Sequence, residues 1–205
     1  MTNFEQLAAM GKPIFLRYDQ KAMIRRYGLT ANATEMLVYY CGEHFRVIRE
    51  TGDILRRDGT PAGPGEMLTI FDMLCRDREP DGLAGCWRPV RSLPGAGQSN
   101  PDDAVFSVVY TKPFEQHPDL LRKACEKLGG KPFPVGDIAY ELPVFRWLPL
   151  VFQFWEGDDE FPSGIRFLWD ENTLQYLHFE TTYYLMLHLL ERLLQEMQKL
   201  HNGTT

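Results

Sequence analysis

Apolar residues near the amino terminus recur at helical spacing and predict helix over residues 2–27, in two pieces. Asn3 precedes the first apolar set, which runs from Phe4 to Met10, and we expect it to cap the helix. The tripeptide Gly11-Lys12-Pro13 then interrupts the pattern. Because proline removes a backbone donor and clashes with the preceding turn, we expect the break between the two helices here.

The pattern changes to strands after residue 35. Apolar segments over 36–41 and 45–48 flank Gly42-Glu43, which predicts a hairpin. Turn residues surround a short third strand at Ile54-Leu55. Helical spacing returns over residues 65–75.

The second half of the chain predicts more strands and a long final helix. Residues 117–128 read as a helix that ends at Gly129-Gly130. Strands are predicted over 138–144, 148–155 and 165–169, and the continuous apolar run of the second is typical of a central strand buried on both faces. A helix over about 179–200 carries apolar residues every three or four positions, so one face should pack on the body.

These elements predict an α+β fold in one domain over residues 1–205. We expect an antiparallel or mixed sheet with N-terminal helices and a long C-terminal helix packed on it, because helices and strands are segregated along the chain. Residues 80–103, rich in glycine and proline, form the longest predicted loop, which either caps the core or acts as a lid.

Composition narrows the class of protein. Twenty-two basic residues face 28 acidic ones, for a net charge of −6, which argues against a nucleic-acid binder and against docking on an anionic membrane. The chain shows no signal peptide and no apolar run near the roughly 20 residues that span a bilayer, so we expect a cytoplasmic protein. Its four cysteines form no C-x-x-C pair, which predicts no iron–sulfur cluster in this chain, and without a secretory signal we expect free thiols.

The most informative segment is an acidic stretch between two predicted strands. Four carboxylates fall within five positions, and without them the net charge would be −2. Like charges in a tight loop disfavour joint ionisation, so something must offset them. A divalent cation, a basic protein partner, or solvent around a loop whose Phe161 and Pro162 pack inward would each do so.

We expect Asp170, at the end of the next strand, to return near this loop. The predicted metal ligands are therefore Asp158, Glu160 and Asp170. Glu180, in the first turn of the last helix, has a sufficient role with the helix dipole. The wider set of ligand-binding candidates is Trp155, Glu156, Asp158, Asp159, Glu160, Phe161, Asp170 and Glu180.

Histidine and cysteine give weaker signals. Cys41 and His44 have a C-x-x-H spacing and could form a zinc set with Cys75 and Cys86, but a second short pair is missing. His178 and His188 lie near the last helix, where a haem ligand or general base is an alternative to an ordinary surface or polar core histidine, which we favour. The chain has no G-x-S-x-G, P-loop or G-x-G-x-x-G motif.

Several short motifs occur in a familiar order. They are Gly136-Asp137, Leu142-Pro143, Leu148-Pro149-Leu150, Trp155-Glu156-Gly157-Asp158-Asp159-Glu160-Phe161-Pro162, Leu168-Trp169-Asp170 and Tyr176-Leu177 followed by Glu180. With them the chain resembles domain-of-unknown-function family three-seven-eight-six over most of its length. The resemblance implies a cytoplasmic protein of an anaerobe, from a family sometimes fused to an iron–sulfur domain, working beside metal, corrinoid or other redox cofactors. Trp169 stands where the family more often has phenylalanine, and Thr181 where aspartate is common.

Three functions follow as hypotheses, and none of them fixes a reaction. The first is a non-catalytic binding or accessory protein that holds a metal, corrinoid or other small cofactor in a pocket between sheet and C-terminal helix, with the acidic loop at its rim. The second is an enzyme in which two carboxylates do general acid–base work, which requires their pKa values to differ. The third is an interaction module whose acidic loop meets a basic partner.

Overall fold

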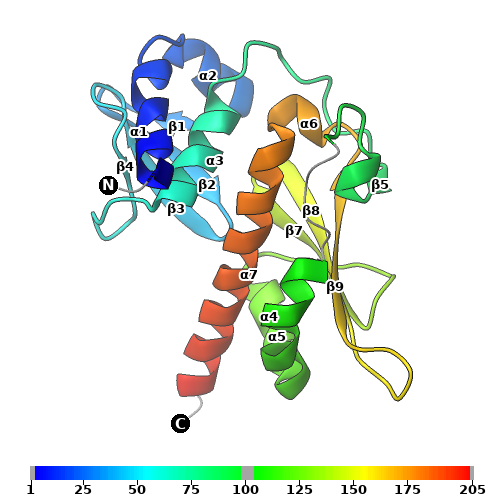
Figure 1. Cartoon of the computed structure of the whole chain (residues 1–205). Coiled ribbons are helices and arrows are strands. Elements are labelled where there is room, and N and C mark those ends of the chain that lie inside the picture. The colour runs from blue at the N-terminus through cyan, green and yellow to red at the C-terminus, as the bar shows by residue number, and fades with distance from the viewer. Residues whose placement is uncertain (1–2, 98–103, 204–205) are drawn as a thin grey trace.

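The computed structural model describes residues 3–97 and 104–203, and it contains two antiparallel sheets (Figure 1). The first sheet has the order β1-β2-β3-β4, formed by Thr30–Ala31, Glu35–Tyr40, Glu43–Ile48 and Ile54–Leu55. Its central hairpin pairs Glu35 with Ile48 and Tyr40 with Glu43. Strand β2 alternates half-buried and fully buried residues, as expected where one face of a sheet packs on the core.

Three helices accompany this sheet: α1 (Asn3–Phe15), α2 (Gln20–Tyr27) and α3 (Pro64–Leu74). The predicted break at Gly11-Lys12-Pro13 is wrong, because α1 continues through Pro13 to Phe15. Gly11 instead allows close packing, since a Cβ there would lie 2.3 Å from Cδ2 of Phe71 on α3. The real break lies at residues 16–19, where the Asp19 side chain accepts from two amides and caps α2.

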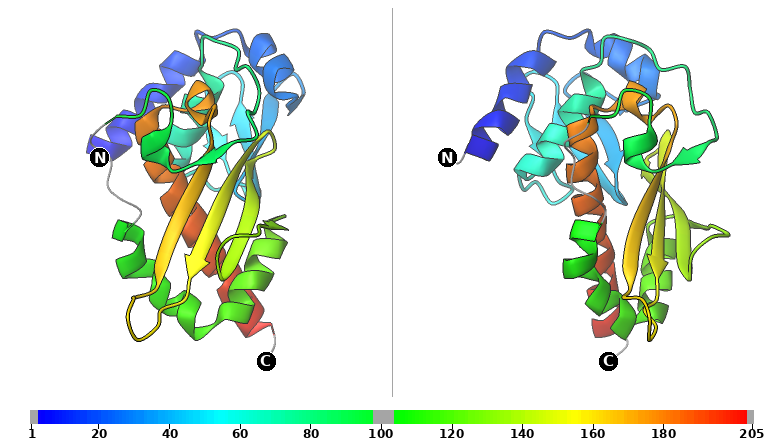
Figure 2. Two further views of the ribbon diagram at one scale, coloured as in Figure 1. Left: turned by 90° about the vertical axis from the view of Figure 1, so that its right-hand side faces the viewer. Right: turned by 45° about the vertical axis from the view of Figure 1, so that its right-hand side comes forward.

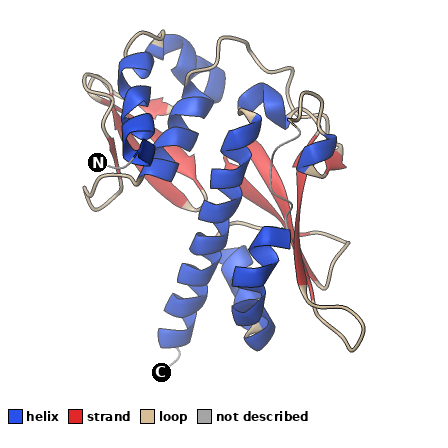
Figure 3. Ribbon diagram, viewed as in Figure 1, coloured by secondary structure: helices blue, strands red, loops and turns tan. Residues whose placement is uncertain are grey.

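The second sheet has the order β5-β9-β8-β7-β6 and lies beside the C-terminal helix (Figures 1 and 3). Its strands are Trp87–Arg88 (β5), Lys131–Pro132 (β6), Ile138–Phe145 (β7), Leu148–Trp155 (β8) and Gly164–Asp170 (β9). Strand β8 is central, and only its second and last residues are more than marginally exposed. The prediction of a central strand buried on both faces is confirmed.

Helices cover one side of the second sheet, as the turned views show (Figure 2). They are α4 (Ala104–Gln116), α5 (Pro118–Lys127), the single-turn α6 (Thr173–Tyr176) and α7 (Phe179–Asn202). Helix α4 was not predicted, since Pro113 lies inside it and its apolar periodicity is weak. The predicted long loop contains β5 and a short 3₁₀ turn at Val90–Ser92, and residues 98–103 of it lie outside the described residues.

The two sheets meet at the turn between β2 and β3. The backbone N–H of Cys41 donates to the carbonyl oxygen of Val144 on β7 at 2.8 Å. Helix α7 contacts α3 on one side and α5 on the other, so it packs against both halves of the chain. The α+β class is therefore confirmed, with two antiparallel sheets, N-terminal helices and a long C-terminal helix. Across the described ranges, no helix combines the length and apolar character needed to cross a bilayer.

Candidate functional site

The acidic loop between β8 and β9 lies in solvent. Asp158 accepts hydrogen bonds from the backbone N–H groups of Glu160 at 2.8 Å and Phe161 at 2.7 Å, which form a local turn and lower the pKa of the Asp158 carboxyl. Phe161 does not pack inward, because 67% of its surface is exposed. The side chains of Glu156, Asp159 and Glu160 are exposed as well.

Asp170 does not return near that loop. The loop joins Trp155 to Gly164, and antiparallel pairing places Asp170 at the far end of β9, roughly 20 Å away at 3.4 Å per residue. Asp170 is 1% exposed and accepts from the backbone N–H groups of Ala84, Gly85 and Asn172 at 2.7–3.0 Å. Its carboxylate therefore holds the segment before β5, and the three predicted metal ligands do not converge.

The remaining candidates are also dispersed. Trp155 is half-buried at the end of β8, and the backbone N–H of Glu156 donates to the side chain of Asp137 at 2.8 Å. Glu180 is exposed in the first turn of α7, where it suits the helix dipole. The described residues gather functional groups elsewhere, where α3, α7 and the β2–β3 turn meet.

The first residue of this site is Glu66, at the start of α3. Its Oε2 accepts from the backbone N–H of Gly63 at 2.6 Å, so the carboxylate caps the helix to which it belongs. The same oxygen accepts from Nη2 of Arg56 at 2.6 Å. Only 6% of the Glu66 side chain is exposed. The second oxygen, Oε1, faces His188 on α7.

His188 is a buried imidazole without hydrogen bonds among the described residues. Its Nδ1 lies 3.7 Å from Oε1 of Glu66, beyond hydrogen-bonding distance, and its Nε2 is fully buried with no partner. Burial lowers the pKa of His188 to about 3, and the guanidinium groups of Arg192 and Arg56 add to the effect. The ring is therefore neutral at pH 7.

An aromatic stack fixes the orientation of that ring. His188 lies parallel to Tyr40 of β2 with centroids 4.6 Å apart, and Tyr40 lies parallel to Phe145 of β7 at 5.0 Å. The stack continues through Trp147 to Tyr27. Because it contains residues of both sheets, the imidazole is held at their junction.

The β2–β3 turn brings a second carboxylate to the site. Cys41 and Gly42 both have positive φ, at 44° and 84°, which forms the tight two-residue turn ahead of Glu43. Oε1 of Glu43 lies 3.4 Å from Nη1 of Arg192, whose side chain is 5% exposed. Arg192 also donates to the Cys41 carbonyl and to the side chains of Gln195 and Glu196.

A cavity of about 460 Å³ opens beside the Glu66–His188 pair, and its lining also includes Arg56, Tyr184 and Glu191. Burial and the neighbouring Glu66 carboxylate raise the pKa of Glu191. A second cavity, of about 370 Å³, includes Glu43, Arg192 and Arg56. Arg56 thus lines both cavities.

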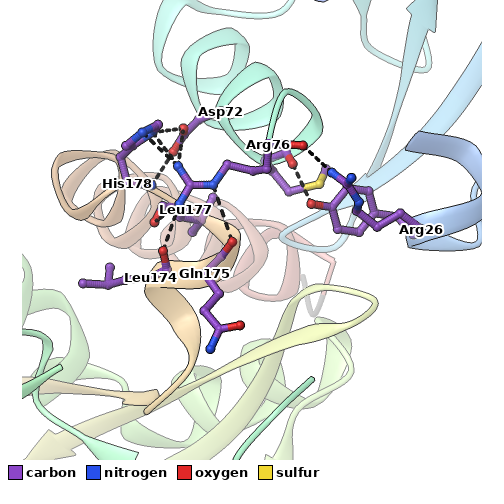
Figure 4. A network of polar contacts seen from close by, with 9 residues as sticks. Arg26, Asp72, Arg76, Leu174, Gln175, Leu177 and His178 are labelled. Atoms are coloured by element: carbon purple, nitrogen blue, oxygen red, sulfur yellow. Dashed lines mark hydrogen bonds and ion pairs between the residues drawn. The ribbon is translucent and has the colours of Figure 1, made fainter. Parts of the chain in front are cut away.

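A second acid–histidine contact joins the C-terminal part of α3 to His178, the residue that precedes α7 (Figure 4). Asp72 accepts from the backbone N–H of His178 at 2.8 Å and also contacts its ring. Arg76 donates to the carbonyl oxygens of Leu174 and Leu177 at the end of α6. Figure 4 shows these groups directed at helix ends, and His178 is 64% exposed at its side chain. We therefore interpret the Asp72–His178 contact as structural and call it the clasp.

Sequence reasoning missed the site because its members are far apart in the chain. Glu66 resembles any helix N-terminal acid, and His188 was interpreted as an ordinary surface or core histidine. The one usable signal was a histidine within the apolar face of the last helix, beside Leu185 and Leu189. The structure gives no support to the zinc set considered for Cys41, His44, Cys75 and Cys86. Within the described ranges, the only group with metal-ligand spacing is Glu43, Glu66 and His188.

No curated protein and no solved structure matches the chain. A family match, by contrast, spans residues 19–192, which includes α2, both sheets and most of α7. Glu43, Glu66, His188 and Arg192 all lie within the matched range. Since the match covers well over half of the sequence, the chain belongs to the family described as Domain of unknown function (DUF3786).

Proposed function

We propose that this chain is a non-catalytic, cytoplasmic binding protein that holds a small ligand in the cavity between α3 and α7. One observation carries the proposal: His188 lines that cavity, is nearly buried, and has no hydrogen bond on either ring nitrogen among the described residues. Free thiols at all four cysteines fit a reducing compartment.

A buried polar group without a hydrogen-bond partner carries an energetic cost. Leaving a buried donor or acceptor unpaired costs about 1–3 kcal/mol, so such groups are uncommon unless they serve a purpose. A phenylalanine would stack on Tyr40 equally well and would avoid this cost. The imidazole therefore makes sense where a ligand supplies the missing bonding partner from the cavity side.

The cavity also offers chemistry for orienting a ligand. Apolar surface from Leu187 and the Tyr184 ring lies beside the polar groups of Arg56, Glu66 and Glu191. A mostly apolar wall with a few converging polar groups is the usual form of a small-ligand site.

Histidine-selective ¹⁵N NMR tests the proposal directly. The chain has five histidines, so the ring resonances of His188 can be assigned by comparison with a His188→Phe variant. Zinc chloride, magnesium chloride, inorganic phosphate, acetate and ethylamine would be titrated separately. We expect at least one probe to shift the His188 resonances saturably, while those of His178 stay in place.

A Glu66→Gln variant supplies the matched control, since it keeps the shape of the side chain and alters the partner that faces His188. A cationic probe should bind this variant at least about tenfold more weakly, whereas phosphate or acetate should bind it no more weakly than wild type. If all five probes leave the His188 resonances unchanged at millimolar concentration, the binding function is rejected.

A further inference from the structure

We infer that the ligand is a single zinc-type divalent cation, coordinated by Glu43, Glu66 and His188. This inference rests on the proposed binding function and names the ligand class. The three residues come from different elements, β3, α3 and α7, and one donor atom of each lies within 4.8 Å of the others.

The one donor pair with a known separation is close to the spacing of an occupied centre. Tetrahedral zinc with bonds near 2.1 Å places neighbouring donor atoms about 3.4 Å apart. Nδ1 of His188 and Oε1 of Glu66 are already 3.7 Å apart. Glu43 has the most freedom to close the remaining gap, because 33% of its side chain is exposed.

Each ligand has a donor position that its other contacts leave open. Arg56 and Gly63 both bond Oε2 of Glu66, which orients the carboxylate and leaves Oε1 for a cation. Such outer contacts are what holds metal-binding carboxylates in place. His188 has no hydrogen bond to give up, and Arg192 keeps the carbonyl of Cys41 if Glu43 turns away.

The charge balance around the site favours a cation. Five carboxylates line the two cavities, those of Glu43, Asp58, Glu66, Glu191 and Glu196, against four basic side chains, those of Arg56, Arg57, Arg192 and Lys199. One imidazole nitrogen with two carboxylates is a ligand set that suits zinc and its first-row neighbours, whereas magnesium prefers oxygen and water alone. Three protein ligands leave a fourth position open to the cavity.

Zinc and cobalt titrations test this inference on the full chain. Protein treated with chelator and dialysed would be titrated with Zn²⁺ by calorimetry and with Co²⁺ by visible absorption, which reports coordination geometry. We expect one Zn²⁺ per chain, and cobalt bands typical of a four-coordinate centre that zinc removes. Wild-type protein without stoichiometric zinc binding would overturn the inference.

Two ligand variants and two control variants test which residues bind the zinc ion. His188→Phe preserves the stack on Tyr40, and Glu43→Gln changes a half-exposed turn residue, so at least the second should fold normally. Each should weaken zinc binding at least about tenfold. The acidic-loop change Asp158→Asn and the clasp change His178→Gln should leave affinity within twofold, and unchanged affinity in Glu43→Gln as well would refute the three-residue centre.

The two proposals fail in different ways. If Zn²⁺ does not bind but phosphate, acetate or ethylamine shifts the His188 resonances, the metal inference is wrong and the binding function stands. If Zn²⁺ binds but neither His188→Phe nor Glu43→Gln weakens it, the bound ion lies elsewhere and the inference is also wrong.

Discussion

Arg192 of α7 donates from Nε to the backbone carbonyl oxygen of Cys41 at 3.2 Å, and the N–H of the same Cys41 donates to Val144 at 2.8 Å. One residue at the end of a tight turn thus connects the C-terminal helix to both sheets. Because the Arg192 side chain is 5% exposed, its bonds are screened little by solvent. The position of Glu43 in the site depends on this joint.

We expect Arg192→Met to lower the free energy of unfolding by about 3 kcal/mol. The change leaves the Cys41 carbonyl unpaired in a buried position and removes the charge that faces Glu43. Urea unfolding would measure the loss. Lys199→Met on the same helix, where 62% of the side chain is exposed, should change stability by less than about 0.5 kcal/mol. Equal losses in both would contradict the role given to Arg192.

Gly42→Ala should cost about 2 kcal/mol through two effects. The new Cβ would adopt a φ of 84° and would lie 2.4 Å from Cδ2 of Leu128. Gly59→Ala separates these effects, because Gly59 has a φ of 87° with open space around it. Gly42→Ala should therefore be the more destabilising change in thermal unfolding, and it should also weaken zinc binding by displacing Glu43.

The stability of the protein should fall on mild acidification because of His188. Its pKa is about 3 in the fold against about 6.5 in the unfolded chain, so below pH 6.5 the unfolded state takes up the proton first. Stability should then decline towards pH 3, by up to about 1.4 kcal/mol per pH unit. The groups that face the ring are Tyr40, Glu43, Arg56, Glu66, Glu191 and Arg192.

Chemical unfolding at pH 7.5 and pH 5 would measure this slope. His188→Phe should be the less pH-dependent protein across that window, where carboxylates with lowered pKa values do not yet titrate. Parallel slopes in the two proteins would show that folding does not shift the pKa of His188.

Asp170→Asn should cost about 2 kcal/mol and should loosen the segment before β5, so that trypsin reaches the bond after Arg78 more readily. The carboxylate accepts three backbone hydrogen bonds while 1% exposed, and an amide keeps the shape but loses the charge and one acceptor oxygen. Asp158→Asn is the matched change in an exposed turn. Limited trypsin digestion should cleave the first variant faster near Arg78 and leave the second close to wild type.

Native thiol labelling should discriminate among the cysteines. Cys41 and Cys125 are buried, and burial raises the pKa of both thiols. Burial raises the pKa of Cys75 to about 12, with the carboxylates of Asp72 and Asp77 adding to the effect. N-ethylmaleimide at pH 7.5, followed by peptide mass spectrometry, should therefore modify Cys86 first and all four only after unfolding.

Local pattern was sufficient for most elements of this fold. The hairpin after residue 35, the buried strand β8 and the periodic helix α7 follow from neighbouring residues, and the structure confirms them. The hairpin turn lies at Cys41-Gly42, one residue before the predicted Gly42-Glu43. The prediction failed where packing overrides a local rule. Pro13 lies within α1, and Gly11 of the same helix packs closely against Phe71.

The candidate site could not be predicted from local sequence pattern, for a different physical reason. The four carboxylates of the acidic loop are neighbours in sequence, and this clustering is why the sequence predicts a site there, yet the loop lies in solvent. Asp170 follows soon after them in the sequence, but the antiparallel register places it at the other end of the hairpin. Glu66 and His188 acquire their character from burial and from Arg56 and Tyr40, which pattern alone does not reveal.

The long α7 also imposes an order of assembly during synthesis. Glu43 and Glu66 leave the ribosome more than a hundred residues before His188 does. At about 5–20 residues per second, the first sheet and α3 would exist for several seconds without the imidazole that faces them. A nascent chain stalled before α7 should therefore carry the carboxylates but not the completed centre, so any metal would be loaded after translation of the helix rather than during it.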